Sequence, residues 1–441
     1  MDNLAAVLMA GGLGTRMHSA VPKHFHPLLG RPMVDWIIAA GRDAGADPIV
    51  VVASPATRDW FDGGRVTLAV QEKPLGTGDS VRSARTALKD YDGHILILSG
   101  DTPMLTGTLL QELVAAHRRE RADATILSAE PPDPRLYGRI VRDADGTVLR
   151  VVEGTDASDE VRRIREINSS IYVFRSAALW PALERLEPKN VQGELYLTDA
   201  IEHVVSAGGR VVAHVAADYR ETDGVNTRVE LAHAAAVLRD RINEGHMLAG
   251  VTIVDPQTTW IEPTVELEPD STIHPFTVLR GATRVATGAE VGANTVAVDA
   301  HIGKDATIGP FCYLRPGTVL GESSKAGTFV EIKNSRIGDR TKVPHLSYIG
   351  DAEIGDDTNV AAGNITVNFS HYPGQPKGRT TIGSNVRTGV QNAFVAPVTI
   401  GDGAWIGAGS VITKDVPADA LAVARTRQEN KEGYAARGRE S

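Results

Sequence analysis

The stretch IGSNVRTGVQNAFVAPVTIGDGAWIGAGSVI, residues 382–412, repeats an apolar or small side chain at every sixth position. The repeated positions are Ile382, Thr388, Phe394, Ile400, Ile406 and Ile412. A period of six differs from the two-residue alternation of a half-buried strand and from the 3.6-residue period of a helix. Three hexapeptides close one triangular coil, so this stretch predicts a left-handed parallel β-helix.

The same period recurs over much of the C-terminal half, from about residue 265 to residue 417. Further repeat positions are Ile273, Leu279, Val285 and Val291, and then Ile302, Ile308, Leu314 and Leu320. Glycine directly follows many of them, as in Ile302-Gly303. We expect the apolar residues to point into the prism and glycine or another small residue to turn each corner. The interruption at 363–380 predicts a loop, and loops on rigid scaffolds commonly carry function.

The first half of the chain predicts an α/β fold. Short apolar runs at 5–10, 49–53, 95–98, 124–127 and 171–174 indicate strands, and amphipathic runs at 34–44, 78–88 and 108–121 indicate helices. This alternation is typical of a mostly parallel, Rossmann-like sheet that binds ligands beyond the carboxyl ends of its strands. The expected domains are this α/β domain at 1–223, a linker helix at 224–247 and the β-helix with a C-terminal tail at 248–441.

The composition sets broad limits on the class of protein. The 441 residues have a formal net charge of −9, which disfavours nucleic-acid binding because phosphate backbones need a basic surface. Cys312 is the single cysteine of the sequence, so an intramolecular disulfide is excluded. We find no signal-peptide pattern and no apolar run of membrane-spanning length. The expectation is a cytoplasmic protein, without nucleic acid and without membrane insertion.

The stretch LMAGGLGTRM, residues 8–17, followed by Pro22-Lys23, carries the chemistry of the first half. Glycines let backbone N–H groups approach phosphate oxygens, and Arg16 and Lys23 supply positive charge. A glycine-rich turn alone is equally well a tight strand–helix connection. With GTRM and the spaced Pro-Lys, the pattern resembles the signature of the sugar-1-phosphate nucleotidyltransferases.

Further motifs follow in the order expected for that family. Gln71 and LGTG (75–78) resemble the loop that receives a uracil, and SGD (99–101) follows a predicted strand. Taken singly, an Asp or Asn in such a turn is usually a cap. The resemblance implies that Asp101 and Asn226 hold Mg²⁺. It also implies that UTP and UDP-N-acetylglucosamine contact Met9, Ala10, Gly11, Gly12, Gly14, Thr15, Arg16, Lys23, Gln71, Gly76, Thr77, Ser99, Gly100, Asp101, Gly138, Glu153, Asn168 and Asn226.

The second half adds FVEIKN (329–334) and PHLSYIGD (344–351), with Arg315 before them and Asn359, Asn368-Phe369 and Lys377 after them. With the N-terminal set, nearly the whole chain resembles the bifunctional N-acetylglucosamine-1-phosphate uridylyltransferase/glucosamine-1-phosphate acetyltransferase family. The resemblance implies that His345 is a general base, a task that suits imidazole near neutral pH, and that Glu331 orients it. It assigns the acetyl acceptor to Arg315, Lys333, Tyr348 and Asn359, and acetyl-CoA to Ala362, Asn368, Phe369, Val390, Ala408 and Arg425.

The chain departs from the family pattern near the thioester. The family usually has Asn-Tyr-Asp-Gly where this chain has Asn368-Phe369-Ser370-His371, and Ser where it has Val390. Asn368 is retained, and we expect it to help stabilise the thioester oxyanion. Gly11 replaces a usual Ala, which we expect to be harmless.

The predicted activity is acetylation of glucosamine-1-phosphate by acetyl-CoA, followed by UMP transfer from UTP with release of pyrophosphate. Two alternatives stay open at this point. One is a single-activity nucleotidyltransferase whose β-helix serves assembly or regulation, and the other is a scaffold that only binds other enzymes. The resemblance also implies a homotrimer whose acetyl site is built from neighbouring subunits.

Overall fold

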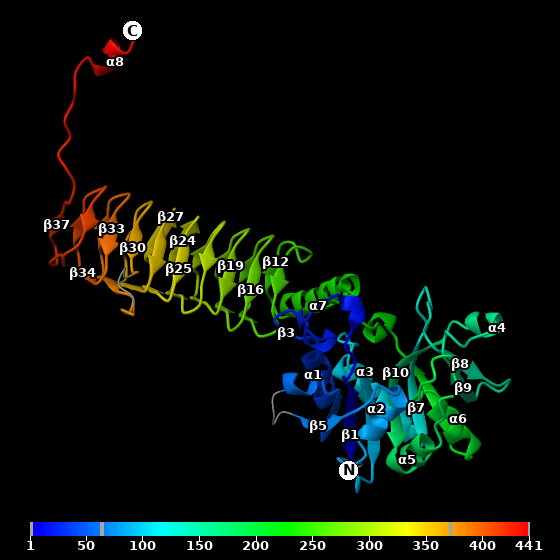
Figure 1. Cartoon of the computed structure of the whole chain (residues 1–441). Coiled ribbons are helices and arrows are strands. Elements are labelled where there is room, and N and C mark those ends of the chain that lie inside the picture. Colours follow the sequence, from blue (N-terminus) through cyan, green and yellow to red (C-terminus); the bar gives the residue numbers. More distant parts are fainter. Residues whose placement is uncertain (1–2, 62–65, 370–373, 440–441) are drawn as a thin grey trace. The chain divides into compact units, whose positions relative to one another are not determined.

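The computed structural model describes residues 3–61, 66–369 and 374–439 (Figure 1). Contacts divide the chain into two compact units, Met1–Leu238 and Arg239–Ser441. The boundary falls inside helix α7 (Arg228–Leu248). Each unit has hydrophobic cores of its own.

The N-terminal unit is built on a sheet with the strand order β11-β7-β10-β6-β1-β4-β5. Its strands are β1 (Leu4–Met9), β4 (Ile49–Ala53), β5 (Thr67–Val70), β6 (His94–Ser99), β7 (Ala124–Ala129), β10 (Ile167–Arg175) and β11 (Val211–Val215). The pairs β1–β4, β1–β6, β4–β5 and β7–β11 are parallel, whereas β10 runs antiparallel to β6 and β7. The hairpin β8 (Arg139–Arg142) and β9 (Val148–Val152) extends from β10, and a small ribbon pairs β2 (Pro27–Leu28) with β3 (Arg31–Pro32). The mixed α/β fold is therefore confirmed.

Helices connect these strands. They are α1 (Met33–Asp43), α2 (Thr77–Ser83), α3 (Gly107–Arg119), α4 (Asp159–Arg162), α5 (Ser176–Glu184) and α6 (Asp199–Ser206), with 3₁₀ turns η1 (Thr15–Met17), η2 (Lys23–Phe25), η3 (Arg58–Trp60) and η4 (Tyr219–Thr222). The helix predicted at 78–88 ends early, at Ser83. Beyond Ser83 the backbone amides donate to the carbonyl oxygen three residues earlier, as the amide of Ala87 does to Ala84 and that of Leu88 to Arg85. This is the hydrogen-bond pattern of a 3₁₀-helix, which is wound more tightly than an α-helix.

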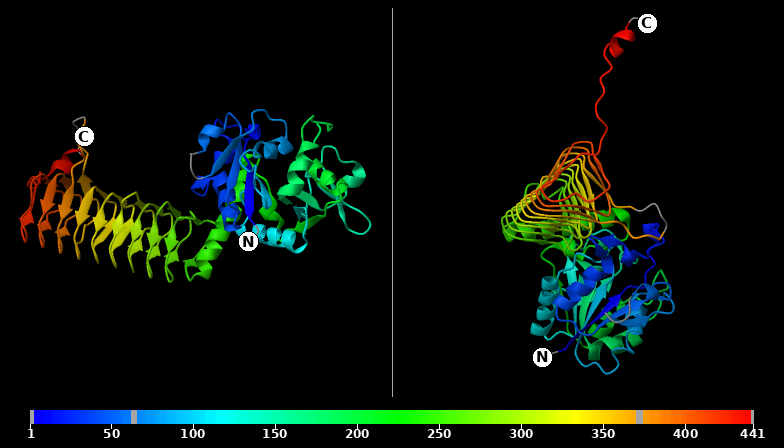
Figure 2. Two further views of the ribbon diagram at one scale, coloured as in Figure 1. Left: turned by 90° about the horizontal axis from the view of Figure 1, so that it is seen from below. Right: turned by 90° about the vertical axis from the view of Figure 1, so that its left-hand side faces the viewer.

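The C-terminal unit is the predicted left-handed parallel β-helix, and its triangular cross-section is visible in Figure 2. The first face contains β12 (Thr252–Ile253), β15 (Thr272–Ile273), β18 (Glu290–Val291), β21 (Thr307–Ile308), β24 (Lys325–Thr328) and β27 (Lys342–His345). Single bridges through Asn359 continue this face into β32 (Arg387–Thr388), β35 (Trp405–Ile406) and β37 (Leu421–Ala422).

The other two faces are continuous sheets. The second face contains β13 (Trp260–Ile261), β16 (Val278–Arg280), β19 (Val296–Val298), β22 (Tyr313–Leu314), β25 (Glu331–Lys333), β28 (Tyr348–Gly350), β30 (Ile365–Val367), β33 (Ala393–Val395) and β36 (Val411–Ile412). The third face contains β14 (Glu266–Leu267), β17 (Arg284–Val285), β20 (His301–Ile302), β23 (Val319–Leu320), β26 (Arg336–Ile337), β29 (Ala352–Ile354), β31 (Thr380–Ile382) and β34 (Val398–Ile400). The short helix α8 (Tyr434–Arg437) lies in the tail.

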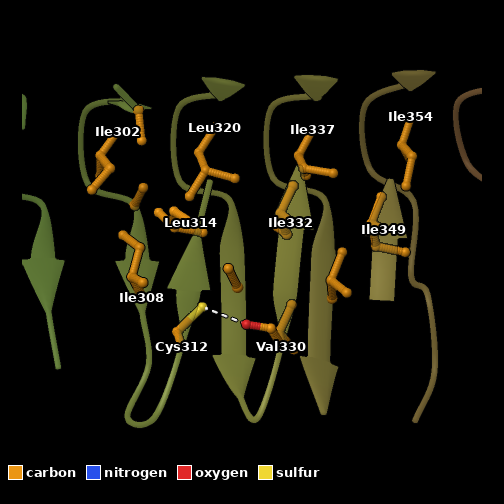
Figure 3. Packing of buried hydrophobic residues seen from close by; sticks show 14 of the residues in the cluster. Ile302, Ile308, Cys312, Leu314, Leu320, Val330, Ile332, Ile337, Ile349 and Ile354 are labelled. Atoms are coloured by element: carbon orange, nitrogen blue, oxygen red, sulfur yellow. Dashed lines mark hydrogen bonds between the residues drawn. The ribbon is translucent and has the colours of Figure 1, made fainter. Parts of the chain in front are cut away.

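The interior of the β-helix is filled by the residues of the six-residue repeat. Every repeat position named from the sequence is buried, and Figure 3 shows Ile302, Ile308, Leu314 and Leu320 stacked in the core. Cys312 is also buried there, and its thiol donates a hydrogen bond to the carbonyl oxygen of Val330.

The expected reason for the glycines after the repeat positions needs correction. Gly303 and Gly338 do not adopt a positive φ; instead, successive coils approach so closely that a Cβ on Gly303 would lie 2.6 Å from the carbonyl oxygen of Leu320. Gly309, which follows Ile308, does turn a corner with a left-handed φ of 81°, and other left-handed corner positions are occupied by Asp305 (φ 55°) and Asp357 (φ 53°). Asp and Asn tolerate this region better than most side chains.

Candidate active sites

A cavity of about 870 Å³ lies at the carboxyl ends of β1 and β6 in the N-terminal unit. The predicted residues that line it are Met9, Gly11, Gly12, Gly14, Thr15, Arg16, Lys23, Gln71, Gly76, Thr77, Ser99, Asp101 and Asn226. Ala10 and Gly100 lie behind this wall. Ala10 is fully buried, and a Cβ on Gly100 would come 2.6 Å from the carbonyl oxygen of Met9. The structure thus brings most of the predicted nucleotide-binding residues to one cavity.

A compact set of charges occupies one end of this cavity. The Lys23 ammonium donates to Asp101 Oδ2 at 2.7 Å and to Asn226 Oδ1 at 3.0 Å, and Arg16 Nη2 donates to the same Asn226 oxygen at 3.0 Å. The Ser99 hydroxyl donates to Asp101 Oδ1 at 2.6 Å. Burial opposes ionisation of Asp101, but the charge and hydrogen bonds of Lys23 and Ser99 outweigh it and lower the pKa of this carboxyl group.

The donor set fits a hard divalent cation. Oxygens of Asp101 and Asn226 converge on a single point, which the Lys23 ammonium now occupies. Within the described residues, no group of three or more His, Cys, Asp or Glu side chains is arranged to hold a metal. A cation bound by this pair would therefore take its remaining oxygen ligands from phosphate groups and water, as Mg²⁺ commonly does.

Asn226 is held in place by a capping box at the start of α7. Glu230 Oε2 accepts hydrogen bonds from the backbone amides of Asn226 (2.8 Å) and Thr227 (2.9 Å), and Thr227 Oγ1 accepts one from the Glu230 amide (3.2 Å). The neighbouring Val225 amide donates to the backbone carbonyl of Asp101 at 2.7 Å. The sequence analysis missed Glu230, although Thr-x-x-Glu before a helix is the signature of this cap.

The predicted sugar-binding residues form a second group. A Cβ on Gly138 would lie 3.5 Å from both Glu153 Oε2 and Asn168 Cβ, so these three residues are neighbours. Glu153 Oε1 accepts a hydrogen bond from Thr198 at 3.1 Å, and burial raises the pKa of the Glu153 carboxyl group. None of the three lines the 870 Å³ cavity. The group adjoins it, because the amide of Leu197 donates to the cavity residue Thr77 at 3.0 Å.

The predicted phosphate-binding residues of the acetyl site lie together on the second face of the β-helix. Arg315 directly follows β22. Its backbone amide donates to the carbonyl oxygen of Ile332, the residue before Lys333 on the next coil. Lys377, in the loop that interrupts the repeat, lies close enough to lower the pKa of Lys333. Arg315, Lys333 and Lys377 therefore gather three cationic side chains at one place, which suits an anion.

Glu331 lies on this face too, and its contacts differ from the expectation. Its carboxylate accepts a hydrogen bond from Arg315 Nη1 at 2.8 Å rather than one from His345. His345 is exposed at the end of β27 on the first face, beyond a corner of the prism. The difference arises because His345 pairs with Thr328 and Glu331 pairs with Tyr348, so the two residues lie on successive coils and on different faces. The register of the coil, which a local motif does not reveal, decides these neighbours.

Four of the predicted acetyl-CoA residues, Ala362, Val390, Ala408 and Arg425, form a line with His345. Successive coils stack His345, Ala362, Val390 and Ala408 at one corner. Backbone hydrogen bonds of 2.8–3.2 Å join the coils there: the amide of Gly363 donates to the His345 carbonyl, that of Gln391 to Ala362 and that of Gly409 to Val390. Arg425 continues the line, since its Cδ lies 3.8 Å from the position that a Cβ on Gly409, the residue after Ala408, would occupy. With rungs about 4.8 Å apart, the line spans roughly 19 Å. Such a line suits a long, narrow ligand.

Asn368 follows β30 and is already engaged. Its Nδ2 donates to Asp351 Oδ2 at 2.5 Å and lies 3.4 Å from the Tyr348 hydroxyl, while Asn334 Nδ2 donates to Asp351 Oδ1 at 2.6 Å. Gly350 makes room for this arrangement, because a Cβ there would lie 2.4 Å from the Tyr348 hydroxyl oxygen. Asp351, to which the sequence analysis gave no role, therefore positions Asn368.

The departures from the family pattern lie at the surface. Phe369 and Val390 are exposed to 68% and 46%. Ser370 and His371, which belong to the same departure, lie outside the described residues.

Asn359 stands apart from the other acceptor residues. Its bridges to Lys342 and Arg387 place it on the first face, whereas Arg315, Lys333 and Tyr348 belong to the second face. A single β-helix therefore does not bring Asn359 together with the phosphate-binding group.

Comparisons with known proteins place this geometry in a family. Residues 6–204 match the model of the MobA-like NTP transferase domain. The chain is 50% identical to the Bifunctional protein GlmU of Streptomyces coelicolor, with 99% of this chain and 94% of that protein covered. The identity with its counterpart from Brevibacillus brevis is 45%, over 99% and 98% of the two chains.

The chain belongs to the GlmU family of bifunctional proteins. The family resemblance seen in the sequence motifs is thereby confirmed, as are the nucleotidyltransferase domain and a nucleotide substrate. No helix among the described residues is long and apolar enough to cross a membrane.

Proposed function

We propose that the chain makes UDP-N-acetylglucosamine in two steps. The β-helix unit transfers the acetyl group of acetyl-CoA to the amine of glucosamine-1-phosphate, and the N-terminal unit then couples the product to UTP. The observation that carries the proposal is the presence of two chemically different residue sets. One lines a cavity with a glycine-rich turn, Arg16 and Lys23 beside the oxygens of Asp101 and Asn226. The other consists of the exposed His345 and of three cationic side chains on the neighbouring face of the β-helix.

For UMP transfer, the residues of the N-terminal unit position two anions. Asp101 and Asn226 would hold Mg²⁺, whose charge offsets the repulsion between the sugar phosphate and the triphosphate. The glycine-rich loop and Arg16 bind the triphosphate, and Gly138, Glu153 and Asn168 orient the sugar. A phosphate oxygen of the sugar-1-phosphate then attacks the α-phosphorus of UTP, and pyrophosphate leaves. Positioning and charge stabilisation carry this chemistry.

For acetyl transfer, Arg315, Lys333 and Lys377 bind the phosphate of glucosamine-1-phosphate, and Tyr348 contacts the sugar. His345 accepts a proton from the sugar amine as the nitrogen attacks the thioester carbonyl carbon. The C–S bond breaks and coenzyme A leaves as the thiolate. The corner from Ala362 to Arg425 holds the coenzyme A chain. Asn368, which Asp351 holds at the far end of β30, helps to bind the thioester.

The active assembly is a homotrimer. The separation of Asn359 from the phosphate-binding group supports this proposal, since one subunit can bring its first face against the second face of another. Mixing inactive Asn359→Ala and Lys333→Ala variants after denaturation should restore acetyl transfer, because mixed trimers contain sites with both residues intact. A monomer in light scattering, or the absence of complementation, contradicts the shared site.

Two separate assays test the proposed function. Pyrophosphate release should require UTP and N-acetylglucosamine-1-phosphate, and thiol release should require acetyl-CoA and glucosamine-1-phosphate. Each reaction should proceed when the substrates of the other are absent. Pyrophosphate release without any thiol release would leave a nucleotidyltransferase with an inactive β-helix.

A further inference from the structure

The side chain of Gln71 is fixed in the wall of the nucleotide cavity. Gln71 follows β5 and is 8% exposed. Its amide nitrogen Nε2 donates to the backbone carbonyl oxygen of Gly76 at 3.1 Å and to Asp79 Oδ2 at 3.0 Å. A primary amide carries two hydrogens, so both are used in these bonds.

Asp79 is itself held firmly. Its second oxygen, Oδ1, accepts a hydrogen bond from Arg82 Nη2 at 2.6 Å, and its side chain is 13% exposed. Each oxygen of this carboxylate therefore has one strong partner. Asp79 does not line the cavity. It acts on the cavity only through Gln71.

The orientation of Gln71 decides what the cavity offers to a ligand. A glutamine amide presents a donor or an acceptor, depending on a half-turn about its last bond. Two acceptors, the Asp79 carboxylate and the Gly76 carbonyl oxygen, oppose that turn and leave Oε1 towards the cavity. This oxygen lies 3.6 Å from a Cβ built on the cavity residue Gly11, and it has no hydrogen-bond partner within the described ranges.

We infer that Asp79 is a specificity-determining residue, which makes Gln71 an acceptor and thereby selects a nucleobase that carries a ring N–H. Uracil has such a donor at N3, flanked by two carbonyl groups. Cytosine has a lone pair at N3, which would face the Gln71 carbonyl oxygen. This inference rests on the proposed uridylyl transfer and adds the residue that enforces its preference for UTP.

The substitution Asp79→Asn reverses the hydrogen-bond polarity without changing size. Arg82 needs an acceptor, so it holds the oxygen of the new amide and turns the nitrogen towards Gln71. Two donors would then face each other. Gln71 relieves this by turning its own nitrogen to the cavity, and it gives up the hydrogen bond to the Gly76 carbonyl oxygen. We expect the UTP:CTP ratio of kcat/KM to fall at least about tenfold, because binding sites discriminate strongly through single polar groups.

Equilibrium titration of UTP and of CTP, without sugar phosphate, measures the same ratio independently of turnover. The conservative variant Asp79→Glu keeps the acceptor and should keep the preference for UTP. Glu184→Gln removes an exposed carboxylate that pairs with Arg85 and serves as the matched control, with no expected change in the ratio.

A folded Asp79→Asn protein with UTP:CTP ratios within twofold of wild type, in both measurements, overturns the inference. An equal loss of both nucleotides also overturns it, because a merely structural role lowers both together. Failure of the proposed function is a different result: wild-type protein would then bind UTP in preference to CTP without releasing pyrophosphate.

Discussion

The two candidate sites solve the same problem, the binding of a sugar phosphate, in opposite ways. In the N-terminal unit, Lys23 is already paired with Asp101 and Asn226 inside a cavity. On the β-helix, the nearest charged partner that shifts the pKa of Lys333 is another cation, Lys377, on an open face. An enclosed site balances its charges internally before substrate binds. The open site leaves the charge of Lys333 and Lys377 to be balanced by the ligand.

The two sites also differ in how their residues are collected. The cavity draws on residues from Met9 to Asn226 that meet at one sheet edge. The acetyl site uses successive coils, so His345, Ala362, Val390 and Ala408 follow one another in a line. We therefore expect substitutions in the cavity to abolish pyrophosphate release. Substitutions along the line should instead change the affinity for acetyl-CoA in small steps.

The largest expected effect is that of Asp101→Ala. Removing this carboxylate deletes a cation ligand and leaves Lys23 with one partner fewer, so UTP-dependent pyrophosphate release should be abolished, a loss of at least roughly 10³-fold. Thiol release from acetyl-CoA should stay close to wild type. Equal loss of both activities would show that the substitution unfolds the protein and that the two sites are not independent.

The substitution His345→Ala should have the opposite effect, so that acetyl transfer is lost and pyrophosphate release is retained. Loss of a positioned general base lowers a rate by roughly 10²–10⁴-fold, so the acetylation rate should fall by that amount while pyrophosphate release is retained. The KM for glucosamine-1-phosphate should change little, because Arg315 and Lys333 remain. Undiminished acetylation in a stable trimer would exclude His345 as the base.

Acidification should weaken the N-terminal unit through His117. This side chain is fully buried between His94 and Thr125, and burial, followed by the charge of His94, lowers its pKa from 6.5 to about 3. Its contribution to stability is complete above pH 6.5 and is lost as the pH falls towards 3, since the unfolded chain then binds a proton that the folded one does not.

As the pH falls from 6.5 to 5, His117 should therefore lower the free energy of unfolding by up to about 2 kcal/mol. Urea titrations at pH 7.5 and pH 5.0 measure this difference. In His117→Gln the difference should be smaller than in wild type. An unchanged pH dependence in this variant would assign the effect to other groups, such as the buried His24.

The smallest expected effects concern Phe369 and Val390, the two positions that depart from the family pattern. Phe369→Tyr and Val390→Ser each restore a hydroxyl group at the thioester end, and one hydrogen bond contributes about 1 kcal/mol, or roughly fivefold in affinity. The KM for acetyl-CoA should fall accordingly, while the KM for glucosamine-1-phosphate stays constant. A change in both constants would place these side chains in the acceptor site instead.

The sequence alone determined the β-helix, because its six-residue period is a local pattern that each coil repeats. Every repeat position named from the sequence is buried, down to the polar Thr388. The glycine-rich loop was equally readable, since phosphate binding needs small residues next to Arg16 and Lys23 in one short segment.

Only the tertiary structure decided which residues meet across long separations. Glu331 was expected beside His345, but the register of the coils pairs it with Arg315. Asp351 and Glu230 lie beneath the sites and orient Asn368 and Asn226 without belonging to either binding surface. Such roles depend on the direction of individual hydrogen bonds between segments, and a linear motif carries no information about direction.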